Sequence, residues 1–357
     1  MRECLKKPTK KGASALRENR IGRQTIVLHH PPAVIGWGSA AGRKEGRGPL
    51  GAAFDFTADD DSLGKKTWEQ AETAFQEKAL AFALDRAGLR GEDLDVLLAG
   101  DLLNQCIASA FHARQAGVPF LGLYGACSTM AESLALAACL LSGGFVRRAA
   151  AMTSSHFCSA ERQYRNPLEY GGQKPPTAQW TATGSGAVIL AAEGAGPRIT
   201  HVTLGRVVDK GITDVGNMGA AMAPGAYDTL RAHFADTGRG PADYDRIVTG
   251  DLGSLGQEIV ADFFRQDGVD LGEVYRDCGV LLFDAKAQDV HAGGSGCGCS
   301  ALVLTGLLLN EMAAGKLDRL LFCGTGALHS PTSAMQGESV PGICHAVAIE
   351  YGKEGTL

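Results

Sequence analysis

The segment YGACSTMAESL, residues 124–134, holds the residue with the clearest chemical potential. Cys127 stands among Gly125, Ala126 and Ser128, directly before an apolar run of helical character. At a helix N-terminus, aligned peptide dipoles and unpaired N–H groups favour a thiolate and lower the pKa of a cysteine. Cys127 is therefore a candidate nucleophile or site-lining residue, with Ser128 beside it. The alternative is a small buried residue, because free cysteines are often buried.

Polar side chains follow two strand-like segments further along the chain. Ser155 and His156 come at the end of the first, at 147–155, and His329 follows the second, at 319–326. Polar groups at the ends of such strands face the crevice in which ligands bind. We expect all three side chains to line the same cavity as the candidate thiol.

A further segment, QKPPTAQWT at 173–181, contributes Lys174 and Gln179 as candidate ligand contacts. Its two successive prolines pre-set an extended backbone at low entropic cost. The segment is interpreted as a dimer arm or a lid. The methionines of NMGAAMAP, at 217–224, favour packing or an interface over chemistry.

The composition is that of an ordinary soluble globular protein. Of its 357 residues, 45% are hydrophobic and 20% charged, and the net charge of −5 argues against nucleic-acid binding. No apolar run reaches the roughly 20 residues that span a bilayer. Ten cysteines without a secretory signal favour reduced thiols inside the cell. Cys297 and Cys299 form a C-x-C without a partner pair at zinc-binding spacing, so we expect no metal and no cofactor.

The start of the chain differs from the rest. The first 24 residues hold eight Lys or Arg against two Glu, and they lack the apolar core of a signal peptide. We interpret residues 1–23 as an exposed, flexible basic tail. Weak attraction to an anionic membrane surface is the alternative to simple solvation.

An internal repeat organises the remaining chain. Residues 93–102 read DLDVLLAGDL, and residues 243–252 read DYDRIVTGDL. Each copy follows an amphipathic helix and leads through a Gly-rich turn into a long apolar helix and another strand. The expected helices are 68–88 and 127–144 in the first copy, and 226–236 and 301–315 in the second.

The alternation of strands and helices predicts two α/β halves, 24–195 and 196–357. The helices at 127–144 and 301–315 are apolar on nearly all faces, and such helices are buried between layers. We expect them to pack together between two sheets, in a five-layer α-β-α-β-α fold. The functional site would lie where the Gly-rich turns meet, at strand C-termini and helix N-termini.

These features resemble a known superfamily. A cysteine in a small-residue turn before a buried helix, in a duplicated chain, is similar to the thiolases and ketoacyl synthases, which implies a thiolase-like fold. Longer segments resemble the stage V sporulation protein AD family of spore-forming Firmicutes, from about Gln24 to Glu350. They are PFLGLYGACSTM, TSSHFCSAERQYRNPLEYGGQKPPTAQWT, NMGAAMAP, VTGDLGSLG and AGGSGCGCSA.

The superfamily resemblance implies catalytic roles. In thiolases and ketoacyl synthases the cysteine that matches Cys127 is acylated. His291 resembles the thiolase histidine that activates that cysteine, and Cys323 resembles the second thiolase cysteine, a proton carrier. A buried, hydrogen-bonded histidine and a packed strand cysteine are the alternatives. Where the superfamily has a His or Asn, this chain has Gly250, which has no side chain to take a proton.

Asp251 follows that glycine. Its carboxylate would repel the enolate charge that the missing residue normally stabilises. The first copy of the repeat carries Gly100 and Asp101 at the matching place. Asp251 is therefore either a structural cap that accepts backbone N–H groups or one of the ligand contacts.

Two functions remain open. The first is a non-catalytic protein for which the family resemblance implies the ligand dipicolinic acid (pyridine-2,6-dicarboxylate), with or without calcium. The family also implies other subunits of the spore channel that takes up this ligand in sporulation and releases it in germination, and a peripheral position at the spore inner membrane. The superfamily implies a homodimer through an edge strand of the first half. The candidate ligand contacts are Cys127, Ser128, Ser155, His156, Lys174, Gln179, Asp251, His291, Cys323 and His329.

The second function is an acyltransferase or condensing enzyme that acts on thioesters. Cys127 would be its nucleophile, with His291 as base and Cys323 as acid. Gly250 argues against this function, because nucleophilic catalysis needs a base within reach.

Overall fold

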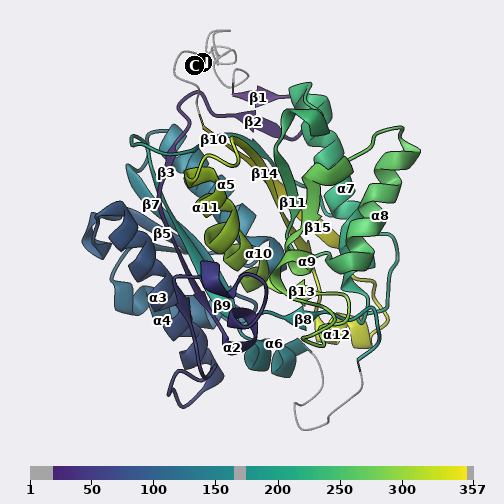
Figure 1. The fold of residues 1–357 in the computed structure, drawn as a ribbon, viewed down its shortest axis with the longest axis horizontal. Coiled ribbons are helices and arrows are strands. Elements are labelled where there is room, and N and C mark those ends of the chain that lie inside the picture. Colours follow the sequence, from purple (N-terminus) through teal and green to yellow (C-terminus); the bar gives the residue numbers. More distant parts are fainter. Residues whose placement is uncertain (1–18, 165–173, 352–357) are drawn as a thin grey trace, which may run out of the picture.

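The computed structural model describes residues 19–164 and 174–351 and arranges them in five layers (Figure 1). The main path of its mixed sheet runs in the order β12-β11-β14-β15-β10-β3-β9-β7-β5-β6. The first half of the chain supplies β3 (Ala33–Ala41), β5 (Val96–Gly100), β6 (Phe120–Gly122), β7 (Arg148–Ser155) and β9 (Gly184–Ala191). The second half supplies β10 (Arg198–Thr203), β11 (Arg246–Thr249), β12 (Tyr275–Asp277), β14 (Arg319–Ala327) and β15 (Gly342–Glu350).

The two sets of strands repeat one pattern. In the first half β3, β9 and β7 are antiparallel neighbours, and β5 and β6 continue parallel to β7. In the second half β10, β15 and β14 are antiparallel, and β11 and β12 continue parallel to β14. The order and relative directions of the strands are therefore the same from either end of the sheet, as expected for a duplicated chain.

Helices fill the layers on both sides of the strands. The helices α3 (Trp68–Ala87) and α4 (Ile107–Ala116) cover the outer face of the first-half strands, and α7 (Met218–Thr237) and α8 (Gly253–Gln266) cover that of the second half (Figure 1). The middle layer holds α5 (Thr129–Ser142), α10 (Cys297–Val303) and α11 (Leu309–Ala313). Shorter elements are α2 (Arg43–Gly46), α6 (Phe157–Tyr164), α9 (Cys278–Leu282), α12 (Pro331–Met335), β1 (Arg20–Ile21), β2 (Thr25–Val27), β4 (Phe56–Thr57), β8 (Trp180–Thr181) and β13 (Gly294–Ser295).

The middle layer is the most deeply buried part of the protein. All seven residues of α10 are buried, and α5 buries Met130 and Leu134 completely. A helix without a polar face can be stable only between two other layers. This confirms the buried position predicted for the two apolar helices, although a π turn at Leu304–Leu308 separates α10 from α11.

The repeated Asp-x-Asp motif has one structural role in both copies. The Asp95 carboxylate accepts the backbone N–H groups of Arg147 and Arg148, at 2.7 and 3.0 Å. The Asp245 carboxylate accepts those of Asp318 and Arg319, at 2.7 and 2.8 Å. Each aspartate thus fastens the start of the parallel neighbour strand to its own strand.

Three expectations need correction. The two sheets are joined, because β10 and β3 pair at Arg198 and Ala33. The helix expected at 226–236 begins at Met218, because the small and apolar residues of NMGAAMAP form its first two turns. Pro224 lies inside this helix.

The third correction concerns the end of the tail expected at residues 1–23, because the chain forms a strand from Arg20. Residues 1–18 lie outside the described residues, but Arg20–Ile21 pairs with Thr25–Val27. The Asp236 carboxylate accepts the N–H groups of Arg23, Gln24 and Thr25 at 3.0–3.1 Å, which holds this hairpin against the end of α7. Among the described residues, no helix is long and apolar enough to cross a membrane.

Candidate functional site

Cys127 lies in a tight turn, Ala126–Ser128, directly before α5. Ala126 has a φ of +52°, a conformation that residues with a side chain rarely adopt. The Ser128 hydroxyl donates to the carbonyl oxygen of Gly125 at 2.6 Å, and the Thr129 hydroxyl donates to that of Ala126 at 2.7 Å. These bonds hold the strained turn, which presents the Cys127 side chain to a cavity.

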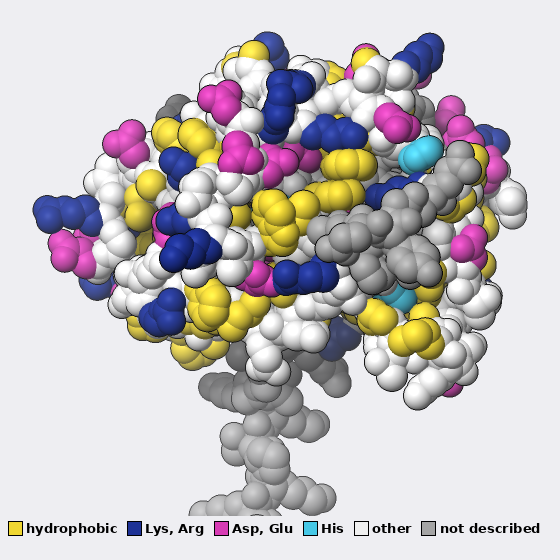
Figure 2. All heavy atoms as spheres, turned by 90° about the horizontal axis from the view of Figure 1, so that it is seen from below, with side chains coloured by type: hydrophobic (Ala, Val, Ile, Leu, Met, Phe, Trp, Pro, Cys, Tyr) yellow, Lys and Arg dark blue, Asp and Glu magenta, His cyan; other side chains and the backbone are white. Residues whose placement is uncertain are grey.

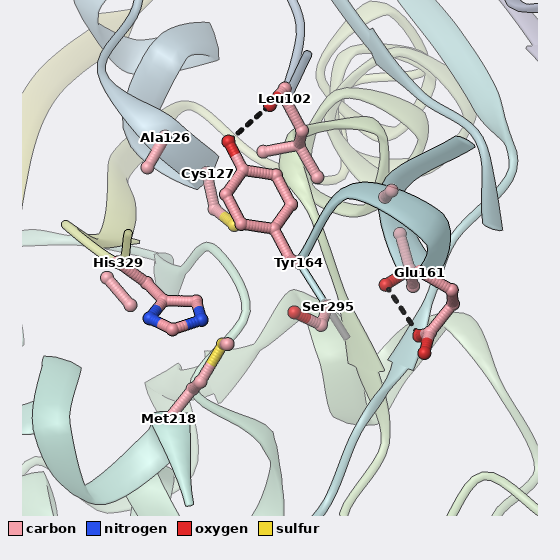
Figure 3. A pocket seen from close by; sticks show the side chains of 11 residues that line it. Leu102, Ala126, Cys127, Glu161, Tyr164, Met218, Ser295 and His329 are labelled. Atoms are coloured by element: carbon pink, nitrogen blue, oxygen red, sulfur yellow. Dashed lines mark hydrogen bonds between the residues drawn. The ribbon is translucent and has the colours of Figure 1, made fainter. Parts of the chain in front are cut away.

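The cavity has a volume of about 60 Å³ and lies between the two halves of the chain (Figure 3). The turn before α5, helix α6 and strand β8 come from the first half, whereas β13, the start of α7 and the end of β14 come from the second. The lining side chains are those of Leu102, Ala126, Cys127, Ala160, Glu161, Tyr164, Thr181, Met218, Ser295, Ala327 and His329. Both copies of the repeat therefore build one site.

The carboxyl group of Asp251 lies near the Cys127 thiol, and each group shifts the pKa of the other. That carboxyl group also accepts the Gly296 N–H at 2.9 Å, the Thr325 hydroxyl at 2.8 Å and the Ser295 hydroxyl at 3.3 Å. Burial raises the pKa of Asp251 to about 6, against the effect of these donors.

The same surroundings reverse the pKa shift expected for Cys127. Burial raises the pKa of its thiol far above the ordinary value, and the negative charge of Asp251 raises it further. The helix N-terminus does not overcome the cost of moving a thiolate out of water. Cys127 is therefore a neutral thiol at neutral pH, which corrects the expectation of a lowered pKa.

The other polar side chains of the cavity lie on α6 and opposite it (Figure 3). The Glu161 carboxylate accepts the Thr181 hydroxyl at 3.4 Å and lies 3.3 Å from the Lys174 Nζ atom. The Tyr164 hydroxyl donates to the carbonyl oxygen of Leu102, and its ring centroid lies 5.8 Å from that of His329. Two aromatic rings and one ion-paired carboxylate thus form the wall of the cavity.

A family model for stage V sporulation protein AD matches residues 22–350. The chain belongs to the stage V sporulation protein AD family. Its sequence is 49% identical to the stage V sporulation protein AD of Bacillus subtilis (strain 168) over 329 residues, which cover 92% of this chain and 97% of that protein. This member of the family is therefore a sporulation protein.

Solved structures show the fold of this AD-family protein. The 3-oxoacyl-[acyl-carrier-protein] synthase III of Aquifex aeolicus VF5 superposes with a TM-score of 0.57 at 14% identity, over 90% of this chain and 100% of that one. A variant of Xanthomonas campestris OleA superposes with a TM-score of 0.56 at 16% identity, over 91% and 99%. The predicted thiolase-like α/β fold is confirmed.

Three of the ten predicted contacts reach the cavity region of this AD-family protein directly. Cys127 and His329 line the cavity, and Asp251 lies close enough to the Cys127 thiol to raise its pKa. Lys174 reaches it only through Glu161. Gln179 does not line the cavity. Its Nε2 atom donates to the carbonyl oxygens of Asp251 and Gly294, both at 2.7 Å.

Three further predicted contacts have internal hydrogen bonds and do not line the cavity. Ser128 holds the turn described above. The Ser155 hydroxyl donates to the Ala182 carbonyl oxygen at 2.7 Å and accepts the Gly298 N–H at 3.1 Å. His156 is buried, with Nε2 3.1 Å from the carbonyl oxygen of Asp61. Ser155 and His156 thus form hydrogen bonds with backbone groups of neighbouring segments.

The expected catalytic trio is not assembled around Cys127. His291 is exposed, and its Nε2 atom lies 3.8 Å from the carboxylate of Asp289. Cys323 is buried inside β14, where burial and the nearby Cys344 raise the pKa of its thiol. Neither lines the cavity. The Gly-rich turn carries His291 to the surface, and the pleat of β14 directs Cys323 into the second-half core.

Gly250 also lacks the room for a catalytic side chain. A Cβ atom at this position would lie 2.9 Å from the backbone nitrogen of Thr325 and 3.0 Å from its hydroxyl oxygen. The adjacent strand thus occupies the space that a base would need.

Several lining residues carry little signal in the sequence. Ala160, Glu161 and Tyr164 lie on one face of α6, and their spacing of one and four residues could have identified that face. The segment NMGAAMAP favours packing or an interface for Met218. The only sequence signal of Ser295 is its place in the Gly-rich turn. Among the described residues, no group of three or more His, Cys, Asp or Glu side chains could hold a metal ion.

Proposed function

We propose that this sporulation protein binds dipicolinic acid in the Cys127 cavity and does not catalyse acyl transfer. The observation that carries the proposal is the burial of the Cys127 thiol at the cavity, next to the buried Asp251 carboxyl group. A thiol whose pKa lies far above neutral is a poor nucleophile, and neither His291 nor position 250 provides a base. The cavity therefore supports binding better than chemistry.

The chemistry of the cavity suits a flat ring that carries carboxylates. Tyr164 and His329 offer ring faces, and Ser295 offers a hydroxyl group. The described lining residues include no Lys or Arg, whereas Glu161 and the nearby Asp251 are acidic. Lys174 offsets the charge of Glu161, whereas Asp251 would repel a free dianion, so the charge balance favours dipicolinate as its neutral calcium chelate.

Calorimetric titration with dipicolinate, with and without equimolar Ca²⁺, tests the proposal. We expect a saturable heat of binding under both conditions, and a higher affinity in the presence of Ca²⁺. Cys127→Ala should weaken binding by about tenfold or more, because it removes lining contacts and exposes Asp251. Cys323→Ala is the matched control, since it removes a buried thiol outside the cavity. No heat at millimolar ligand under either condition would exclude the proposal.

We infer that the protein acts as one subunit of the spore channel complex for dipicolinate, held peripherally at the inner spore membrane. The family membership supports this role. We also infer a homodimer through β6, the end strand of the sheet. Leu121 of this strand (47% exposed) and Tyr124 just after it (51% exposed) leave a partly apolar edge, which another strand can cover.

One observation favours the enzymatic alternative. The strained turn at Ala126 presents Cys127 directly before a helix, as a nucleophile would be presented. Incubation with acetyl-coenzyme A tests it: release of free coenzyme A that Cys127→Ala abolishes would establish acyl transfer. We expect the wild type to release free coenzyme A no faster than the Cys127→Ala variant does.

A further inference from the structure

Four side chains beside the cavity form what we call the lysine–aromatic cluster: Lys44, Phe157, Lys174 and Trp180. The rings of Phe157 and Trp180 stack with centroids 3.9 Å apart and planes 11° apart. The Lys44 Nζ atom lies 3.4 Å from the Trp180 ring centroid. The Lys174 Nζ atom lies 4.8 Å from the Phe157 centroid and 5.0 Å from that of Trp180. Two ammonium groups thus converge on one pair of stacked rings.

The carboxyl groups nearby leave this cluster positive. Glu161 pairs with Lys174 at 3.3 Å. Glu45 is fully buried, and burial raises its pKa to about 8, so it is mostly neutral at pH 7 and does not balance Lys44. Asp289 also faces Lys44, but its side chain is 92% exposed and water screens its charge.

Lys44 itself is half-buried. Burial lowers the pKa of its ammonium group, and the positive charge of Lys174 acts in the same direction. The Trp180 ring offsets part of this cost, because a cation is attracted to the face of an indole. An ammonium group held in place and partly desolvated is a strong donor to an anion.

The cluster shares elements with the cavity but lies outside it. Phe157 begins α6 and Trp180 begins β8, and residues further along both elements line the cavity, whereas none of the four cluster side chains does. Figure 2 looks at the face that carries α2, α6 and β8. It shows hydrophobic side chains gathered near the centre, with Lys and Arg as well as Asp and Glu side chains around them.

We propose that the lysine–aromatic cluster is a second binding site, for a small free oxyanion such as a carboxylate or phosphate. The ammonium groups of Lys44 and Lys174 donate charge-assisted hydrogen bonds to its oxygens. The stacked rings of Phe157 and Trp180 fix the position of the two lysines. This site does not depend on what the Cys127 cavity binds.

Titration of the full chain with sodium phosphate at constant ionic strength, followed by tryptophan fluorescence, tests the site. We expect a saturable change that Trp180→Phe abolishes. Lys44→Gln should weaken the apparent affinity by about tenfold or more, the usual effect of losing a hydrogen bond from a charged group. Lys78→Gln is the matched control, because Lys78 lies 4.2 Å from the Phe56 ring without a second ammonium group there.

Three outcomes would overturn the proposal. They are no saturable change in the wild type, equal weakening in Lys44→Gln and Lys78→Gln, and a change that persists in Trp180→Phe. A parallel arm measures co-sedimentation with phosphatidylglycerol vesicles. Binding to vesicles that requires Lys44, without a response to phosphate, would reject a free anion in favour of a lipid headgroup. Cys127→Ala should leave the phosphate response unchanged.

Discussion

The Cys127 thiol and the Asp251 carboxyl group come from different halves of the chain and lie close together at one cavity. Both are buried, and each changes the protonation of the other. A thiol beside a carboxylate stays protonated, whereas the condensing chemistry of thiolases requires a thiolate. This proximity is the physical basis of our proposal that the cysteine of this thiolase-like fold lines a binding site.

The first prediction concerns the reactivity of that thiol. At pH 7.5, iodoacetamide should modify Cys127 at least tenfold more slowly than a free cysteine in a peptide, because alkylation requires the thiolate. Asp251→Asn removes the negative charge and should accelerate the reaction. Mass spectrometry of the peptide that contains Cys127 measures both rates. An equal rate in the two proteins would show that Asp251 has no influence on the thiol.

The second prediction concerns Glu45 and pH. Burial raises the pKa of this carboxyl group to about 8, so the folded state binds the proton more tightly than the unfolded state. The stabilisation is complete below about pH 4.5 and is lost as the pH rises toward 8, at a cost on the order of 4 kcal/mol.

Glu45→Gln cannot deprotonate, so its unfolding free energy should fall less than that of the wild type between pH 5 and pH 8. Calorimetric melting at four pH values measures the difference. Glu92→Gln is the control, because the Glu92 side chain is 74% exposed. Parallel pH curves for Glu45→Gln and the wild type would contradict the prediction.

The third prediction concerns the space at Gly250. Gly250→Ala forces a Cβ atom against Thr325 and should destabilise the fold by about 1–3 kcal/mol. Gly240→Ala should be nearly neutral, since a Cβ atom there meets no other atom within 4 Å. Urea denaturation of both variants provides the measurement. If Gly250→Ala were as stable as the wild type, sterics would not explain the glycine.

The fourth prediction concerns the sheet edge at β6. Leu121→Lys places a charge on the edge that we infer to be the dimer interface, and it should convert the dimer to a monomer. Light scattering coupled to size-exclusion chromatography measures the mass. Val207→Lys alters a similarly exposed residue of the second half and should remain dimeric. A wild-type monomer at micromolar concentration would remove the basis for the interface.

The fifth prediction compares the two copies of the repeat. Asp95→Ala and Asp245→Ala each leave two backbone N–H groups without their acceptor. Each should lower the free energy of unfolding by about 1–2 kcal/mol, the cost of a lost cap. Chemical denaturation of the two variants should give similar values, whereas a large loss in only one would mean that the two roles differ.

The sequence was sufficient for the fold because the fold depends on patterns that repeat. The Asp-x-Asp motifs, the apolar helices and the Gly-rich turns each occur twice, and each recurs at the same place in the structure. The joining of the two sheets at Arg198 and Ala33 could not be predicted, because a single pair of residues leaves no periodic signal.

The candidate site was less predictable. Cys127 and His329 were found because they follow turns and strand ends, where side chains face a crevice. His291 was misleading, since its type matched a catalytic residue while its turn directs it to solvent. The effect of Asp251 on the thiol pKa depends on burial and on a contact between distant segments. Neither can be derived from the sequence of one segment alone.

The hairpin β1–β2, which Asp236 fastens to the end of α7, has a practical consequence. It lies at the end of the molecule opposite α6 and β8, the elements that carry the cavity wall (Figure 1). The hairpin therefore lies far from the site. An affinity handle or an immobilising linker attached at this hairpin should leave the cavity and the lysine–aromatic cluster open to added ligand.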